Sequence, residues 1–181
     1  MSHTVTMVLI IIVVLIAAFL LFAASRPNGF RVERTTRIKA PPEKIFAVLN
    51  DFLRWEAWSP WEKKDPAMKR TFSAVTSGKG AVYAWEGNRD VGQGRMEIAE
   101  SVAPSKVAIK LDFVKPFETH NIVEFTLEPK ADSTNVTWAM QGPMPYISKL
   151  ITVFVNMDSM VGKDFEAGLA NLKAVTENQP R

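Results

Sequence analysis

The stretch KVAIKLDFV, residues 106–114, alternates between apolar and polar side chains. Large apolar residues occupy every second position, namely Val107, Ile109, Leu111 and Phe113. Successive side chains of a β-strand point to opposite faces, so this period of two predicts a strand with one covered face and one face in water.

Similar stretches surround this strand. Five of them lie between residues 68 and 142: KRTFSAVT, GAVYAWEG, GRMEIAESV, NIVEFTLEP and NVTWAMQG. A further one, FRVERTTRIKA, precedes them at residues 30–40. Short connections such as SGKG, APS and KADST join neighbouring strands as antiparallel hairpins. The sequence therefore predicts an antiparallel sheet of seven strands.

Two segments of helical period bracket the later strands. PPEKIFAVLNDF, at residues 41–52, begins with prolines that suit the first turn of a helix, and WEAWSPW follows at residues 55–61. Residues 144–175 carry an apolar stripe at helical spacing, and they are the only large segment able to cover the sheet. The predicted class is α+β, with a curved sheet around one long C-terminal helix. A bent sheet and a straight helix diverge at one end, leaving an apolar concavity suited to a ligand.

An uncharged apolar segment, VTMVLIIIVVLIAAFLLFAA, occupies residues 5–24. Twenty helical residues at a rise of ~1.5 Å span ~30 Å, the thickness of a bilayer core. A secretory signal is the alternative, because AAS at residues 23–25 permits cleavage. No basic residue precedes the segment, however, and it exceeds the roughly 7–15 apolar residues of such signals. We predict one transmembrane helix within an anchor and linker at residues 1–29, and a ligand-binding domain at residues 30–181.

The basic residues are concentrated directly after this segment. Residues 26–39 contain five basic side chains and one acid, whereas the chain from residue 40 onward contains 17 basic and 18 acidic residues. The positive-inside rule then predicts a single-pass membrane protein whose C-terminal domain is cytoplasmic. A domain so close to neutrality lacks the basic surface that nucleic-acid binding requires.

Familiar catalytic and metal-binding patterns are missing from the sequence. The chain has no cysteine, and its two histidines are His3 and His120. Disulfides and cysteine-based sites are therefore excluded, and a histidine triad or histidine metal site is not expected. We predict no metal and no cofactor, and the pattern leaves the oligomeric state open.

Four segments carry a resemblance to a known family: APPEKIFAVLNDFLRWEAWSPWEK, YAWEGN, FTLEPK and DFEAGLANLK. They resemble the SRPBCC superfamily of START-like or helix-grip proteins, in its branch of polyketide cyclases/dehydrases and lipid-transport proteins. The resemblance covers roughly residues 30–177, with the same order of elements. It implies a helix-grip fold with a hydrophobic pocket between sheet and helix, and binding of an apolar small molecule or lipid. It implies no shared catalytic residues.

Several side chains are candidates to line this pocket. Trp58 and Trp61 either form its rim or plug the wide end of the core, because they follow the short helices. Tyr83 and Trp85 share one face of a strand, with polar tips able to orient a ligand. The remaining candidates are Met96, Ile98, Phe113, Phe125, Trp138 and Phe154.

Asp158 interrupts the apolar stripe of the C-terminal helix, four residues after Phe154. A carboxylate facing the pocket would need a partner or a proton, because burying an isolated charge is costly. Desolvation would raise its pKa and suit it to general acid–base work, which makes Asp158 a weak catalytic candidate. Alternatively the helix bends or ends early, with Gly162 and Gly168 favouring a bend, and Asp158 stays in water.

Three functions follow from these patterns. The first is a membrane-tethered protein that binds a hydrophobic small molecule or lipid in the pocket, favoured by the anchor and by the missing catalytic set. The second is a cyclase- or dehydrase-like enzyme in which Asp158 and Tyr83 act as a general acid–base pair. The third is a structural or regulatory partner with a filled core and no ligand.

Overall fold

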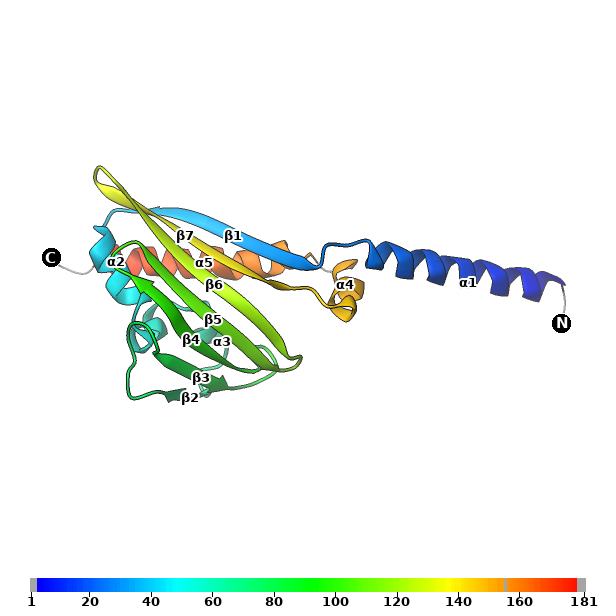
Figure 1. Ribbon diagram of the computed structural model, residues 1–181, viewed down its shortest axis with the longest axis horizontal. Helices are drawn as coiled ribbons and strands as arrows, with labels where there is room; N and C mark the ends of the chain where they lie inside the picture. Colours follow the sequence, from blue (N-terminus) through cyan, green and yellow to red (C-terminus); the bar gives the residue numbers. More distant parts are fainter. Residues whose placement is uncertain (1–2, 155, 179–181) are drawn as a thin grey trace.

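The computed structural model describes residues 3–154 and 156–178, and it contains one antiparallel sheet of seven strands (Figure 1). The strand order is β1-β7-β6-β5-β4-β3-β2. The strands are β1 (Gly29–Ile38), β2 (Lys69–Phe72), β3 (Val82–Glu86), β4 (Gln93–Val102), β5 (Lys106–Lys115), β6 (Thr119–Lys130) and β7 (Ser133–Pro143). The predicted α+β class and the seven-stranded curved sheet are confirmed.

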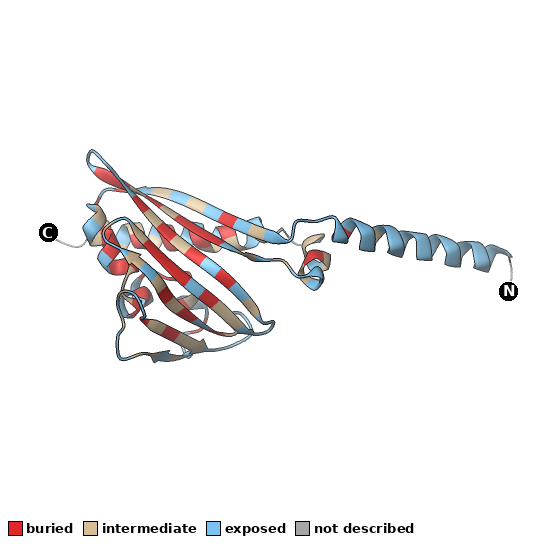
Figure 2. Cartoon of the chain, in the orientation of Figure 1, coloured by how far each residue is buried: buried red, intermediate tan, exposed pale blue. Residues whose placement is uncertain are grey.

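The period of two in the sequence appears directly as alternating burial. On β5, Val107, Ile109 and Leu111 are buried whereas Lys110 is exposed, although the small Ala108 on the opposite face is also buried (Figure 2). The inner faces of neighbouring strands are in register, since Phe125 on β6 pairs with both Val107 and Trp138. These aligned apolar residues form the floor on which the helices pack.

Three short helices between β1 and β2 close one end of the sheet. They are α2 (Pro42–Leu49), the 3-10 helix η1 (Phe52–Ala57) and α3 (Pro60–Lys64). Pro42 occupies the first turn of α2, where a missing backbone N–H costs no hydrogen bond. The backbone N–H of Leu53 donates to the Asp51 carboxylate at 3.1 Å, which caps η1. Prolines and short polar caps therefore break this connection into three pieces.

The predicted single C-terminal helix is two helices, α4 (Tyr146–Thr152) and α5 (Met157–Glu177). Asn156 caps α5, and its side chain accepts a hydrogen bond from the backbone N–H of Ser159 at 3.1 Å. An asparagine at this position favours the start of a new helix over the interior of a longer one. Only α5 covers the sheet, and α4 lies beside the N-terminal helix (Figure 1).

Helix α5 packs closely against the sheet through a glycine. The buried side chains of Phe165, Leu169 and Leu172 form its inner face. A Cβ at Gly168 would lie 2.6 Å from Cζ3 of Trp138 and 3.1 Å from Cδ of Pro60. Helix α5 runs through Gly168 without interruption, so this glycine serves close approach to the sheet.

The N-terminal helix α1 (His3–Ala24) projects away from the sheet (Figure 1). It is long and apolar enough to cross a bilayer, with a mean hydropathy of 3.4, and few of its residues are buried against the rest of the protein. A signal sequence near the N-terminus satisfies the same criteria. Strand β1 begins five residues after α1 ends.

Gly168→Ala is expected to destabilise the protein although alanine is the better helix former. The gain of about 1 kcal/mol in helix propensity is opposed by an overpacking cost of about 1–3 kcal/mol, because the new methyl group meets the Trp138 indole. Chemical denaturation of the full chain in detergent measures the change. The cost should shrink in a Trp138→Phe background, whereas a stabilised Gly168→Ala protein would contradict the close contact.

Candidate ligand-binding site

A cavity of about 410 Å³ lies between the inner face of the sheet, α3 and the N-terminal half of α5. Six methionines line it, and they are all the methionines after residue 29: Met68, Met96, Met140, Met144, Met157 and Met160. Methionine side chains are flexible and polarisable, so they adapt to ligands of different shape. Met96 was among the predicted pocket residues, whereas a methionine in an apolar stripe otherwise looks like any other core residue.

Six of the predicted pocket residues are brought together in the wall of this cavity: Trp61, Tyr83, Trp85, Met96, Phe113 and Trp138. Trp85 packs edge-on against Phe113, with ring centroids 5.7 Å apart. Trp138 stacks on Phe165 of α5 at 4.2 Å and an interplanar angle of 10°. Aromatic faces from the sheet and from the helix therefore meet at the floor of the cavity.

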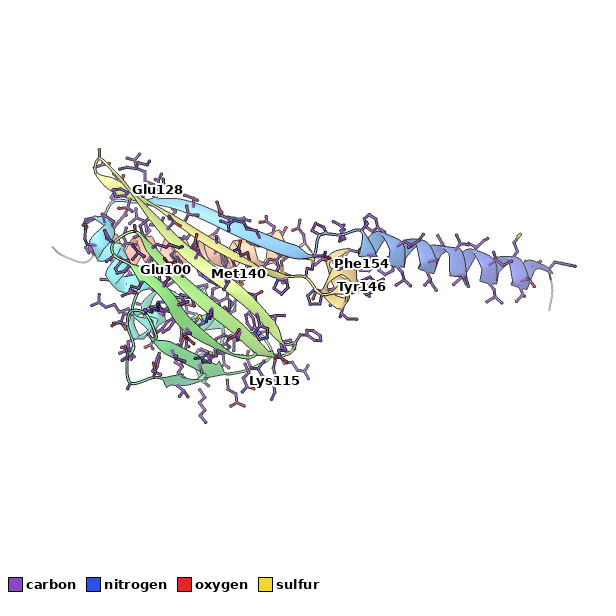
Figure 3. The ribbon with its side chains drawn as sticks, viewed as in Figure 1. Glu100, Lys115, Glu128, Met140, Tyr146 and Phe154 are labelled. Carbon is purple, nitrogen blue, oxygen red and sulfur yellow. The ribbon has the colours of Figure 1, made fainter. Side chains whose placement is uncertain are left out.

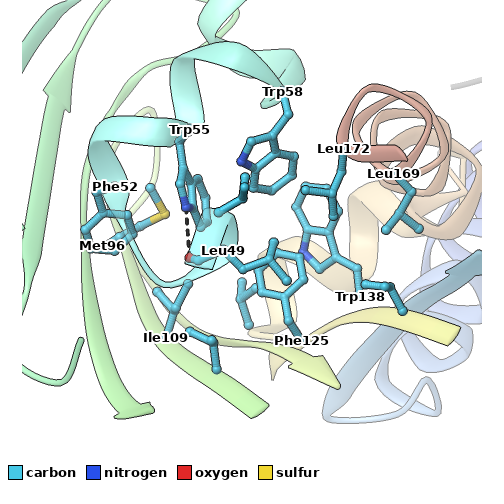
Figure 4. Packing of buried hydrophobic residues seen from close by; sticks show 14 of the residues in the cluster. Leu49, Phe52, Trp55, Trp58, Met96, Ile109, Phe125, Trp138, Leu169 and Leu172 are labelled. Carbon is cyan, nitrogen blue, oxygen red and sulfur yellow. Dashed lines mark hydrogen bonds between the residues drawn. The ribbon is translucent and has the colours of Figure 1, made fainter. Parts of the chain in front are cut away.

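Trp58, Ile98 and Phe125 lie outside the cavity, in the solid part of the core. Figure 4 shows Trp58 and Phe125 among the packed side chains. Trp58 is fully buried, 4.9 Å from the Trp55 ring and 5.4 Å from the Trp138 ring. The indole N–H of Trp55 donates to the carbonyl of Leu49 at 3.1 Å and holds η1 against α2. Of the two alternatives for Trp58, rim of the pocket or plug of the core, the structure therefore agrees with the plug. Trp61 lines the cavity wall.

Phe154 also lies outside the cavity, because it falls in the break between α4 and α5. Its side chain is largely exposed and contacts Phe19 of α1, with ring centroids 5.6 Å apart. The helical spacing that placed Phe154 on the stripe of α5 does not continue across Asn156. The prediction that it faces the sheet is corrected accordingly.

Asp158 lies at the surface, on the first turn of α5, and does not line the cavity. Arg34 of β1 holds its carboxylate through two hydrogen bonds of 2.9 and 3.0 Å, and also donates to Glu166 at 2.7 Å. The hydrogen bonds from Arg34 lower the pKa of Asp158. This ion pair leaves Asp158 charged and outside the cavity that Tyr83 lines, so the expected acid–base pair is not assembled.

A buried acid that the sequence did not single out, Glu62 of α3, lies in the cavity wall. The hydroxyl of Tyr83 donates to one of its oxygens at 2.6 Å, and Nε of Arg70 donates to the other at 2.6 Å. Burial, followed by the hydrogen bond to Glu62, raises the pKa of Tyr83. Tyr83 therefore stays neutral, and both oxygens of Glu62 are occupied. The partners come from β3 and β2, so no local spacing revealed this network.

Asn121 of β6 places a second polar group in the wall, and its side chain is buried. Its amide nitrogen donates to the Thr119 hydroxyl at 3.3 Å, whereas its amide oxygen has no hydrogen-bond partner among the described residues. The oxygen sits against Gly142, where a Cβ would collide with it. An unpaired buried acceptor is costly, and this oxygen lies against Gly142 with almost no accessible surface.

Within residues 3–154 and 156–178, no group of three or more histidine or acidic side chains is placed to hold a metal ion. His120 lies at the surface and pairs with Asp112 at 2.7 Å. The cavity wall consists mainly of apolar side chains, with a few polar groups such as Glu62, Tyr83 and Asn121.

The Tyr83–Glu62 network predicts a specific loss of stability at alkaline pH. Below the ordinary tyrosine pKa of 10.0, folded and unfolded chains both carry the phenolic proton. Above it the unfolded chain releases the proton and the folded chain keeps it, so stability falls as pH rises, by at most about 1.4 kcal/mol per pH unit.

Urea denaturation in detergent at pH 9, 10 and 11 measures this slope. Tyr83→Phe should be less stable at pH 9, because Glu62 loses a partner, but should lack this part of the alkaline slope. Identical slopes for the two proteins would show that Tyr83 does not hold its proton in the folded state.

The fold is shared with solved structures at low sequence identity. Protein CV1439 from Chromobacterium violaceum matches with a TM-score of 0.58 and 16% identity, over 84% of this chain and 100% of that one. The Aha1 dimer from Colwellia psychrerythraea gives 0.59 and 17%, over 82% and 97%. CalU16 from Micromonospora echinospora gives 0.54 and 16%, over 84% and 85%. At such identities the likeness carries the fold alone.

Comparison with curated proteins gives no significant match. Residues 29–177, which include the whole sheet, α5 and every cavity-lining residue, match the family described as "Polyketide cyclase / dehydrase and lipid transport". The chain belongs to this family of polyketide cyclases/dehydrases and lipid-transport proteins.

Proposed function

We propose that the protein binds a hydrophobic small molecule or lipid in the cavity between the sheet and α5, while α1 tethers it to a membrane. The observation that carries this proposal is a cavity of about 410 Å³ with a wall of methionine and aromatic side chains. Its volume falls in the range of roughly 300–1,000 Å³ that is usual for ligand sites. The cavity also argues against the third hypothesis, a structural or regulatory partner with a filled core and no ligand.

The charges around the cavity favour an apolar ligand. Of the three acids that line it, Glu62 is paired with Arg70, and Asp164 is paired with Lys64 at 2.7 Å. Asp90 lies at the exposed rim. A charged ligand group would lose its hydration inside without gaining a free partner.

Binding without chemistry is favoured over a cyclase- or dehydrase-like activity. A general base must lie within hydrogen-bond reach of the proton that it takes from the ligand. The carboxylate of Glu62 is already engaged by the Tyr83 hydroxyl and by the cation of Arg70, and Asp158 is held at the surface by Arg34. The family description covers carriers as well as enzymes, and this wall supports the carrier alternative.

Tethering by α1 would place the domain where apolar ligands are concentrated. The helix is apolar from residue 7 to its end, and five basic residues follow within residues 26–39. By the positive-inside rule these residues favour a cytoplasmic C-terminal domain. Partition into the bilayer would supply apolar ligands beside it.

Val123→Trp should abolish or weaken ligand binding, because Val123 of β6 lines the cavity and a larger ring would fill it. Ile122→Trp is the matched control, since Ile122 is the neighbouring residue and faces solvent. The probe is cis-parinaric acid, added to the full chain in detergent and followed by energy transfer from tryptophan. We expect saturable binding that weakens about tenfold or more in Val123→Trp and is unchanged in Ile122→Trp.

Thermal unfolding of both variants provides the check on folding. Failure of the unmodified chain to bind cis-parinaric acid and other apolar probes would sink the proposed function. Equal binding by the two variants would place the ligand somewhere other than this cavity.

A further inference from the structure

An apolar surface on α4 and the start of α5 is exposed to solvent. We call it the α4 patch, and its members are Tyr146, Ile147, Ile151, Phe154 and Met160, each between 44% and 80% exposed. Large apolar side chains that gather in one place on a surface mark an interaction site, whereas single ones need no explanation.

The α4 patch is continuous with the end of α1 (Figure 3). Phe154 contacts Phe19 with ring centroids 5.6 Å apart, and the hydroxyl of Tyr146 donates to the carbonyl of Leu20 at 3.1 Å. The 22 residues of α1 extend ~33 Å at ~1.5 Å each, and a bilayer core is ~30 Å thick, so nearly the whole helix is needed to span it. Phe19 and Leu20 would then lie within the hydrocarbon, near its boundary. Their contacts place the α4 patch at the same depth.

The polar groups near α4 are arranged consistently with this depth. Lys149, the only charged residue of α4, is buried and donates to the side-chain oxygen of Asn28 at 2.5 Å. Helix α4 therefore turns its cation inward and its isoleucines outward, the reverse of a helix that faces water. Tyr146 has an apolar ring and a polar tip, as side chains at a bilayer boundary commonly do. The guanidinium of Arg26 lies over the Phe22 ring at 4.9 Å, where a phosphate headgroup would be within reach.

The same two helices form one end of the cavity. Ser148 of α4 lines it together with Met157 and Met160 of α5. Met160 also belongs to the exposed α4 patch, and the adjoining wall residue Pro143 is exposed. The rim of the cavity at this end is therefore continuous with the α4 patch.

We propose that the α4 patch lies in the bilayer interface and that the cavity takes up its ligand directly from the membrane, between α4 and the first turns of α5. This inference rests on the tether and the cavity of the proposed function and adds a second, lateral contact with lipid. The occupant of the patch is the lipid bilayer. A second copy of the chain or another protein is the competing occupant that the experiment must separate.

The absence of cysteine allows single labels to report depth in the full chain. We label three single-cysteine variants with nitrobenzoxadiazole: Ile147→Cys, Ile151→Cys and Met160→Cys. Each is placed in vesicles of phosphatidylcholine and phosphatidylglycerol that contain lipids with a nitroxide at a shallow or a deep position on the acyl chain. The control is Val102→Cys, at the end of β4 remote from α1 and as exposed as Ile151. We expect blue-shifted emission at the three patch positions and quenching by shallow nitroxides several-fold stronger than at Val102.

A label at Val13→Cys, in the middle of α1, reports the anchor separately. If deep nitroxides quench the label at Val13 but the patch labels behave like the label at Val102, this inference is overturned. The membrane tether of the proposed function would still be supported. No quenching at Val13 overturns both. Blue-shifted patch labels that nitroxide lipids do not quench would mean that protein, rather than lipid, covers the patch, and would also overturn it.

Ligand uptake provides a second test with residues that do not line the cavity. The double variant Ile147→Asp and Ile151→Asp should take up cis-parinaric acid from vesicles about tenfold more slowly, because carboxylates are poorly tolerated at this depth. Its affinity for the same probe in detergent should be unchanged, which separates this result from a failure of the cavity. Val102→Asp is the control for added charge. Equal uptake rates in the double variant and the unmodified chain would exclude entry across this surface.

Discussion

The packing of α5 on Trp138 is the constraint on which the rest of the domain depends. Phe165 stacks on the indole at 4.2 Å, and Gly168, one turn later, leaves no side chain between helix and sheet. Beyond this contact the buried side chains of Leu169 and Leu172 fill the space between helix and sheet. Before it the helix borders the cavity. One contact therefore divides the interior into a solid core and a cavity, and its position on α5 determines how much volume a ligand can use.

Much of this arrangement was predictable because strand periodicity is a local property. The alternation at Val107, Ile109 and Leu111 assigned the covered face of β5, and the same logic placed Tyr83 and Trp85 on one face of β3. Glu62 was missed because its role depends on partners in two other strands. Most of the methionine lining was missed for a different reason: nothing in a sequence distinguishes a methionine beside an empty space from one in a filled core.

The cavity stays apolar because the nearby charges are directed elsewhere. Asp158 looked anomalous in an apolar stripe, yet Arg34, on the first strand, turns it to the surface. Glu62, in the cavity wall, forms an ion pair with Arg70. Each pairing removes a group that would otherwise hold water inside, so the walls favour a ligand that water solvates poorly. The sparse polar contacts that remain act on orientation rather than on affinity for charge.

The break between α4 and α5 explains both the incorrect placement of Phe154 in the pocket and the exposed α4 patch. A continuous helix would have turned Ile147, Ile151 and Phe154 toward the sheet along with Phe165. Because Asn156 starts a new helix, those residues lie apart from the sheet, and Phe154 contacts Phe19 of α1. A single capping residue thus converts one long apolar stripe into two surfaces with different partners. The surface on α5 packs on the sheet and bounds the cavity, and the surface on α4 extends the apolar surface of α1 to the rim of that cavity. The proposed uptake of an apolar ligand from the membrane would follow this second surface.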